Sequence, residues 1–221
     1  MAKTWRFVFA MLAVSCLGMT ALAEQVDNPS YTTWAKCKPG TTVTMKQDMD
    51  IPGMGDMPTM PNMPNMSGMK IETTRTLKLL EVKPDSLTVE VTTKTQMMGR
   101  GREDKTKETI LAKIEKGQEN VPQGVPTDAK SEVKDMKEGK ETLEIKGKKI
   151  ETVTHEFTVN VAADPTARGG RGAPPSGPAH FKTWNSAEIP GGLVKLEQTS
   201  NAEGMEGVKV KMEVTDYNFV K

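Results

Sequence analysis

Cysteine, histidine and aromatic residues are scarce in this chain of 221 residues, which holds two cysteines, two histidines and 5% aromatics. The sequence contains no G-x-S-x-G, H-E-x-x-H or G-x-x-x-x-G-K-[ST] motif, so common hydrolase, zinc-protease and nucleotide-binding signatures are missing. His180 stands beside a Gly- and Pro-rich stretch, and Cys37 has no obvious histidine partner. These absences predict a protein that is not an enzyme.

An excess of either charge is also missing, because 30 Lys and Arg residues stand against 29 Asp and Glu residues. A dedicated nucleic-acid or anionic-membrane binder normally carries a marked basic excess. The balance therefore predicts no nucleic-acid partner.

Only one apolar run is long enough to be notable, and it lies at the N-terminus. Lys3 and Arg6 precede the apolar residues 7–17, and an A-x-A site ends at Ala23. The run is shorter than the roughly 20 residues that a spanning helix needs. We predict that residues 1–23 are a signal peptide and that the mature protein is periplasmic or secreted, not integral to a membrane. The alternative is a lipid anchor on Cys16. Cleavage after Ala23 would leave Cys37 as the one remaining cysteine, which excludes an internal disulfide.

Alternating apolar and polar residues run through most of the remaining chain. In "SLTVEV" and "VKVKMEV" every second residue is apolar, as expected for antiparallel strands with one solvent-exposed face. Hairpin turns are predicted at Lys83-Pro84-Asp85 and at Gly147. Asp27 or Asn28 is expected to cap a short N-terminal helix that ends at Pro39-Gly40, and residues 128–139 to form one other short helix. The fold class is thus mainly β, with a single antiparallel sheet in one domain, 24–221.

Two segments rich in Gly and Pro interrupt this pattern, and we predict flexible inserts at 50–69 and 163–180. The first insert has a methionine at every third position, namely Met54, Met57, Met60, Met63, Met66 and Met69. Three of these methionines precede prolines, which favours polyproline II geometry with three residues per turn and a row of thioethers along one edge. The row is open to three interpretations: a low-complexity loop, a set of Cu(I) ligands, or an apolar docking edge.

Two short motifs suggest a relationship. "WAKCKPG" carries Trp34, Lys38, Pro39 and Gly40, and "WNSAEIPGG" carries Trp184, Ser186, Pro190, Gly191 and Gly192. The chain thereby resembles a group of uncharacterised exported bacterial proteins that pair an early W-x-x-x-K-P-G with a late W-x-S-x-x-[IV]-P-G-G. The order of strands is similar to that of the periplasmic lipoprotein-carrier superfamily, which implies a curved, half-barrel-like sheet with helices in its hollow.

We expect a non-enzymatic binding or envelope-maintenance protein that holds a lipid or another amphiphile on the apolar face of the sheet. The candidate ligand contacts are Trp184 and His155, although both residue types are also common in protein cores. No cofactor is expected in this interpretation. One alternative is a Cu(I)-binding protein that uses the methionine row, and another is an envelope scaffold.

Overall fold

The computed structural model describes residues 24–51, 69–97, 100–116, 132–161, 177–201 and 207–220. One helix and eleven strands lie in these ranges: β1 (Gln25–Asp27), α1 (Pro29–Trp34), β2 (Thr42–Ile51), β3 (Met69–Val82), β4 (Ser86–Met97), β5 (Arg100–Leu111), β6 (Lys113–Glu115), β7 (Glu132–Ile145), β8 (Lys148–Val161), β9 (Gly177–Asn185), β10 (Leu193–Ser200) and β11 (Val208–Asn218). Within these ranges, no helix has both the length and the apolar character that crossing a membrane requires.

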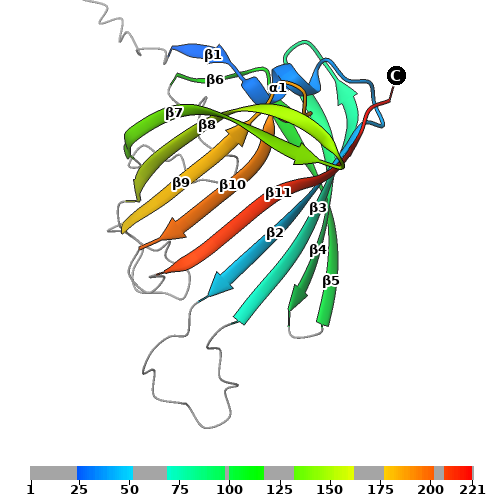
Figure 1. Ribbon diagram of the computed structural model, residues 1–221. Coiled ribbons are helices and arrows are strands. Elements are labelled where there is room, and N and C mark those ends of the chain that lie inside the picture. Colours follow the sequence, from blue (N-terminus) through cyan, green and yellow to red (C-terminus); the bar gives the residue numbers. More distant parts are fainter. Residues whose placement is uncertain are drawn as a thin grey trace, which may run out of the picture.

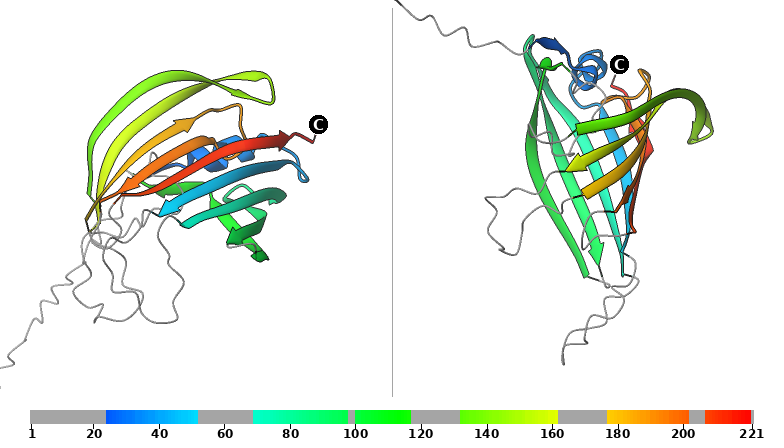
Figure 2. Two further views of the ribbon diagram at one scale, coloured as in Figure 1. Left: turned by 60° about the horizontal axis from the view of Figure 1, so that its bottom comes forward. Right: turned by 90° about the vertical axis from the view of Figure 1, so that its left-hand side faces the viewer.

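Nine strands form one curved antiparallel sheet in the order β5-β4-β3-β2-β11-β10-β9-β8-β7 (Figures 1 and 2). Strands that are neighbours in sequence pair as hairpins, while β2 and β11 join the two ends of the chain at the centre of the sheet. The sheet curls without closing, so it has a hollow face and an outer face. The predicted mainly β fold with a single curved antiparallel sheet is confirmed.

Helix α1 lies with the small β1–β6 ribbon at one end of the sheet (Figure 1). Asn28 caps the helix, because its Oδ1 accepts a hydrogen bond from the Ser30 amide at 3.0 Å, and Pro29 takes the first helical position. Tyr31 donates its hydroxyl proton to the Lys83 carbonyl oxygen at 2.6 Å and so joins the helix to the β3–β4 turn. The predicted N-terminal helix is confirmed, but it ends at Trp34 and not at Pro39-Gly40.

The β7–β8 hairpin turns at Lys146 and Gly147, which both have positive φ (50° and 75°) as a tight hairpin turn requires. Its tip reaches the C-terminal end of β11 (Figure 1). There Lys146 forms an ion pair with Asp216, and the Lys148 ammonium lies 5.9 Å from the centre of the Tyr217 ring. Ile150, next to this turn, is fully buried. Contacts at its tip therefore join the hairpin to β11.

The sheet buries one row of apolar side chains from each of its central strands. This core includes Val43, Leu77, Leu79, Leu87, Val89, Val91, Phe157, Val159, Leu196 and Val214. These residues recur at every second position along their strands, which is the alternation that the sequence displays.

Three further details of the sequence prediction are wrong. The second short helix is absent from the described residues, because Glu132–Ile145 forms strand β7. Residues 177–180, which the sequence predicts to lie in the second insert, begin β9. Residues 50, 51 and 69, which it predicts to lie in the first insert, belong to β2 and β3. The predicted signal peptide (1–23), residues 52–68 and residues 162–176 lie outside the described part of the chain.

Candidate functional site

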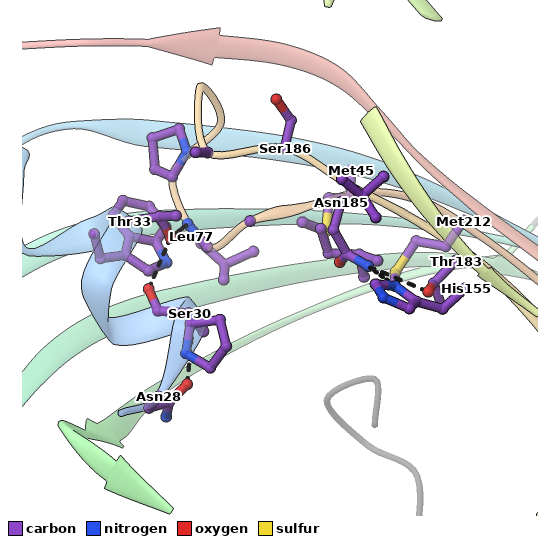
Figure 3. Close-up of a pocket in the computed structure, with 18 of the residues that line it drawn as sticks. Asn28, Ser30, Thr33, Met45, Leu77, His155, Thr183, Asn185, Ser186 and Met212 are labelled. Atoms are coloured by element: carbon purple, nitrogen blue, oxygen red, sulfur yellow. Dashed lines mark hydrogen bonds between the residues drawn. The ribbon is translucent and has the colours of Figure 1, made fainter. Parts of the chain in front are cut away.

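A cavity of about 380 Å³ lies between α1 and the hollow face of the sheet. Such a volume falls in the range of small-molecule pockets, which are mostly apolar and carry a few polar groups that orient the ligand. Figure 3 shows α1 with Asn28, Ser30 and Thr33 at one end of the pocket. His155, Thr183 and Asn185 lie at the other end.

The apolar wall comes mainly from the central strands. Met45 of β2, Leu77 of β3 and Met212 of β11 are at most 9% exposed and line the cavity, together with Leu193 and Ile114 from its margins. Each strand residue follows the inward alternation of its own strand. The two methionines are unbranched and flexible, which suits a surface that adapts to an apolar ligand.

Polar side chains gather at the end of the cavity away from α1. Asn185 Nδ2 donates to Thr183 Oγ1 at 3.2 Å and lies 3.4 Å from His155 Nδ1. Because an amide nitrogen only donates, Nδ1 of His155 accepts this hydrogen bond and Nε2 carries the ring proton. His155 Nε2 is thus a donor that a ligand oxygen could use.

Arg75 is the one charged side chain among the described residues that line the cavity. It lies on β3 two residues from Leu77 and directly opposite Met45 on β2, so it projects from the hollow face. Its Nη2 pairs with Glu108 Oε1 of the edge strand β5 at 3.2 Å. About a third of the Arg75 side chain is exposed, which places the cation at the border between the apolar wall and solvent.

The end of the cavity next to α1 is closed by the Pro190-Gly191-Gly192 turn. The Gly191 amide donates to Thr33 Oγ1 at 3.0 Å. Trp34 is 1% exposed, and a Cβ on Gly191 would come within 3.0 Å of its Nε1. Within the described part of the chain, this Nε1 has no hydrogen-bond partner. The early and late sequence motifs therefore meet in one contact that seats α1 on the sheet.

The two ligand contacts expected from the sequence lie on different faces of the sheet. His155 lines the cavity, whereas Trp184 does not. Trp184 stands between Thr183 and Asn185, which both line the cavity, so strand alternation directs its ring to the outer face.

On that outer face, Trp184 Nε1 donates to Glu141 Oε2 at 2.7 Å. The Lys195 and Lys182 ammonium groups lie 4.3 Å and 4.8 Å from its ring centre. The Lys182 ammonium, which donates to Glu141 Oε1 at 2.8 Å, and the Trp184 indole together lower the pKa of the Glu141 carboxyl below its ordinary value. Trp184 thus anchors a polar cluster between β7, β9 and β10.

The proposed copper ligands Met54, Met57, Met60, Met63 and Met66 lie outside the described residues, and Met69 begins β3. Across the ranges that the structure describes, no three His, Cys, Asp or Glu side chains are grouped as a metal site would require. Cys37 is half-buried and donates its thiol proton to the Thr33 carbonyl oxygen at 3.6 Å. Burial raises the pKa of this thiol, with a smaller opposing effect of Lys36.

Sequence reasoning missed Arg75 and Asn185 as site residues. Arg75 had a usable signal, because it shares the inward alternation of Leu77 and Leu79 and is a charge on an apolar face. Asn185 had none, since its role depends on the pairing of β9 with β8. Comparison of the sequence with protein-family models and with curated proteins finds no match.

Proposed function

We propose that this chain is a non-enzymatic binding protein that holds one amphiphilic molecule in the cavity between α1 and the sheet. The observation that carries this proposal is the cavity itself, with an apolar wall on the central strands and polar groups at one end. A ligand with an alkyl chain would gain roughly 0.8 kcal/mol for each methylene that it buries there. Hydrogen-bonding groups such as His155 Nε2 would fix its polar end.

The charged start and A-x-A site of the sequence support an exported protein, and the proposed compartment is therefore the periplasm or the exterior. A carrier would promote the passage of an amphiphile through that aqueous space, because exposure of an alkyl chain to water is unfavourable. A maintenance or carrier role in the cell envelope follows from this combination.

The proposal is tested by filling the cavity. Val153 of β8 is half-buried, lines the cavity and pairs with Asn185, so Val153→Trp places a large ring where the ligand would lie. Isothermal titration calorimetry with monolauroylglycerol and with dodecanoate, each below its micellar concentration, should show binding that Val153→Trp weakens at least tenfold. Glu156→Trp is the matched control, because Glu156 is exposed on the same strand and does not line the cavity. Binding of neither probe to the unaltered protein, or equal binding by both variants, would refute the proposal.

A further inference from the structure

Arg75 is the one charged group among the described residues that line the cavity, and the other lining side chains are apolar or neutral polar. A lone cation on an apolar wall needs a partner, because a charged group that leaves water is stabilised only by pairing and hydrogen bonding. Here the partner is Glu108, which reaches across from the edge strand β5.

The Arg75–Glu108 pair is open to exchange. The side chains are 32% and 43% exposed, and the contact is a single Nη2–Oε1 approach at 3.2 Å. Partly exposed ion pairs contribute little to stability, so separating this pair costs little free energy. A guanidinium has five donors in a planar fork, so most of the Arg75 donors are not used by this one contact.

Arg75 also stands in the correct place for the charged end of an amphiphile. It pairs in register with Met45, which lies beside His155 and Asn185 in Figure 3, at the end of the cavity away from α1. From there the apolar wall runs past Leu77 toward α1 and Ile114. An alkyl chain directed toward α1 would leave its head group at Arg75.

Building on the proposed binding function, we propose that the ligand is an anionic amphiphile whose carboxylate or phosphate is bound by Arg75 in exchange for Glu108. Arginine binds both anions through two parallel N–H···O hydrogen bonds, which a neutral head group cannot accept in the same way. Glu108 acts as an internal competitor: it neutralises Arg75 in the empty protein and is displaced when the ligand anion enters. The exchange replaces one carboxylate on Arg75 with another anion and requires no proton transfer.

The test compares probes that share one alkyl chain and differ in charge: dodecanoate, dodecyl phosphate and monolauroylglycerol. Arg75→Gln should weaken the binding of the two anions by about tenfold or more, as expected for loss of a charge-assisted contact, and leave monolauroylglycerol within about twofold. Arg75→Lys keeps the charge and should retain part of the affinity for the anions. Glu108→Gln should strengthen anion binding several-fold, because the competitor is removed. The probe with the larger loss in Arg75→Gln identifies carboxylate or phosphate as the preferred head group.

Two matched controls account for net charge. Arg102→Gln removes an exposed arginine of β5 that pairs with Asp104 at 2.7 Å and does not line the cavity. Glu103→Gln removes a carboxylate of β5 that pairs with Lys94. Neither variant should change the affinity for any probe. Equal losses for charged and neutral probes in Arg75→Gln, or no loss at all, would overturn the role of Arg75 and leave the binding function standing. Failure of the unaltered protein to bind any of the probes would overturn both.

Discussion

At the scale of single residues, Gly191 combines a left-handed backbone with a close approach to a buried ring. Its φ of +88° lies in the left-handed region, and a Cβ there would approach Trp34 Nε1 to 3.0 Å. Trp34 is buried, so the ring has little room to move. The contact between the two sequence motifs therefore depends on the absence of a side chain at this position.

We predict that Gly191→Ala lowers the free energy of unfolding by more than the roughly 1–2 kcal/mol that left-handed geometry alone costs a residue with a Cβ. Gly192→Ala is a matched control for the left-handed backbone, because Gly192 has φ of +79° but a Cβ there would make only ordinary contacts at 3.9 Å. Gly101→Ala controls for both effects, since a Cβ at Gly101 would have no atom within 4 Å and its φ is not strained. Urea unfolding should rank the losses as Gly191, then Gly192, then Gly101; similar losses at Gly191 and Gly192 would show that the approach to Trp34 is unimportant.

The Glu141 carboxylate should make stability depend on acid pH. Hydrogen bonds from Lys182 and from Trp184 lower its pKa in the folded protein, so the unfolded chain binds the proton more readily. The stabilisation by Glu141 is therefore complete above the carboxyl pKa of the unfolded chain and is lost as the pH falls through the lowered pKa of the folded state.

Glu141→Gln should thus reduce the urea midpoint at neutral pH, and the difference from the unaltered protein should shrink as the pH falls through the acid range. Glu144→Gln supplies the control, because it makes the same change at an exposed position of the same strand. A difference between Glu141→Gln and the unaltered protein that is constant from neutral to acid pH would contradict the ionic role of Glu141.

At the scale of elements, β2 and β3 allow a direct test of the methionine row. Ile51 and Met69 are register partners in the antiparallel β2–β3 pair, so residues 52–68 join two strand ends that already face each other. Replacing residues 52–68 with Asn-Gly, the preferred two-residue hairpin turn, should keep or raise stability. Each halving of loop length favours closure by about 0.6 kcal/mol.

Thermal unfolding of this shortened variant measures that effect, and loss of the cooperative transition would mean that the row takes part in packing.

The same variant tests the copper alternative. If thioethers of the row are ligands, Cu(I) titration under reducing conditions should show binding to the full chain that is lost with the segment. Equal binding by both forms, or binding by neither, would end that alternative.

The strands with a buried face were predictable from sequence, and the exposed edge was not. Parts of β3, β4 and β11 carry an apolar residue at every second position, as in Leu87, Val89 and Val91 of β4, so period-two alternation identifies these strands. Strand β7 is an edge strand with mostly exposed residues, and its register shifts between Lys134 and Lys137, where Asp135 has φ of 55°. Both features erase the alternation, and the polar composition of the segment then favours a helix when the sequence is considered alone.

The start of β9 and the composition of the cavity depend on long-range pairing. Gly177 and Pro178 are typical of loops, yet they pair with Val161 and Asn160 of β8. Met45 and Met212 could be placed on the apolar face from alternation alone. Their meeting with His155 and Asn185 could not, because it follows from the strand order and from the curl of the whole sheet.

At the scale of the whole molecule, the cavity results from the difference in length between helix α1 and the strands of the sheet. With six residues, α1 is about 9 Å long, whereas strands of 10 to 14 residues such as β2 and β3 extend about 30–45 Å. The helix therefore covers one end of the hollow and leaves apolar wall beyond it. The nearly balanced charge of the chain adds no strong field of its own, so local groups such as Arg75 determine which ligand charge is favoured.

The central claim is that this hollow holds an amphiphile. Its most direct test is native mass spectrometry of the unaltered protein and of Val153→Trp, each purified from the natural host without detergent. We predict one bound amphiphile per chain in the unaltered protein, identified by its mass after release, and a bare chain for Val153→Trp. A bare chain in both preparations, or the same adduct on both, would contradict the claim.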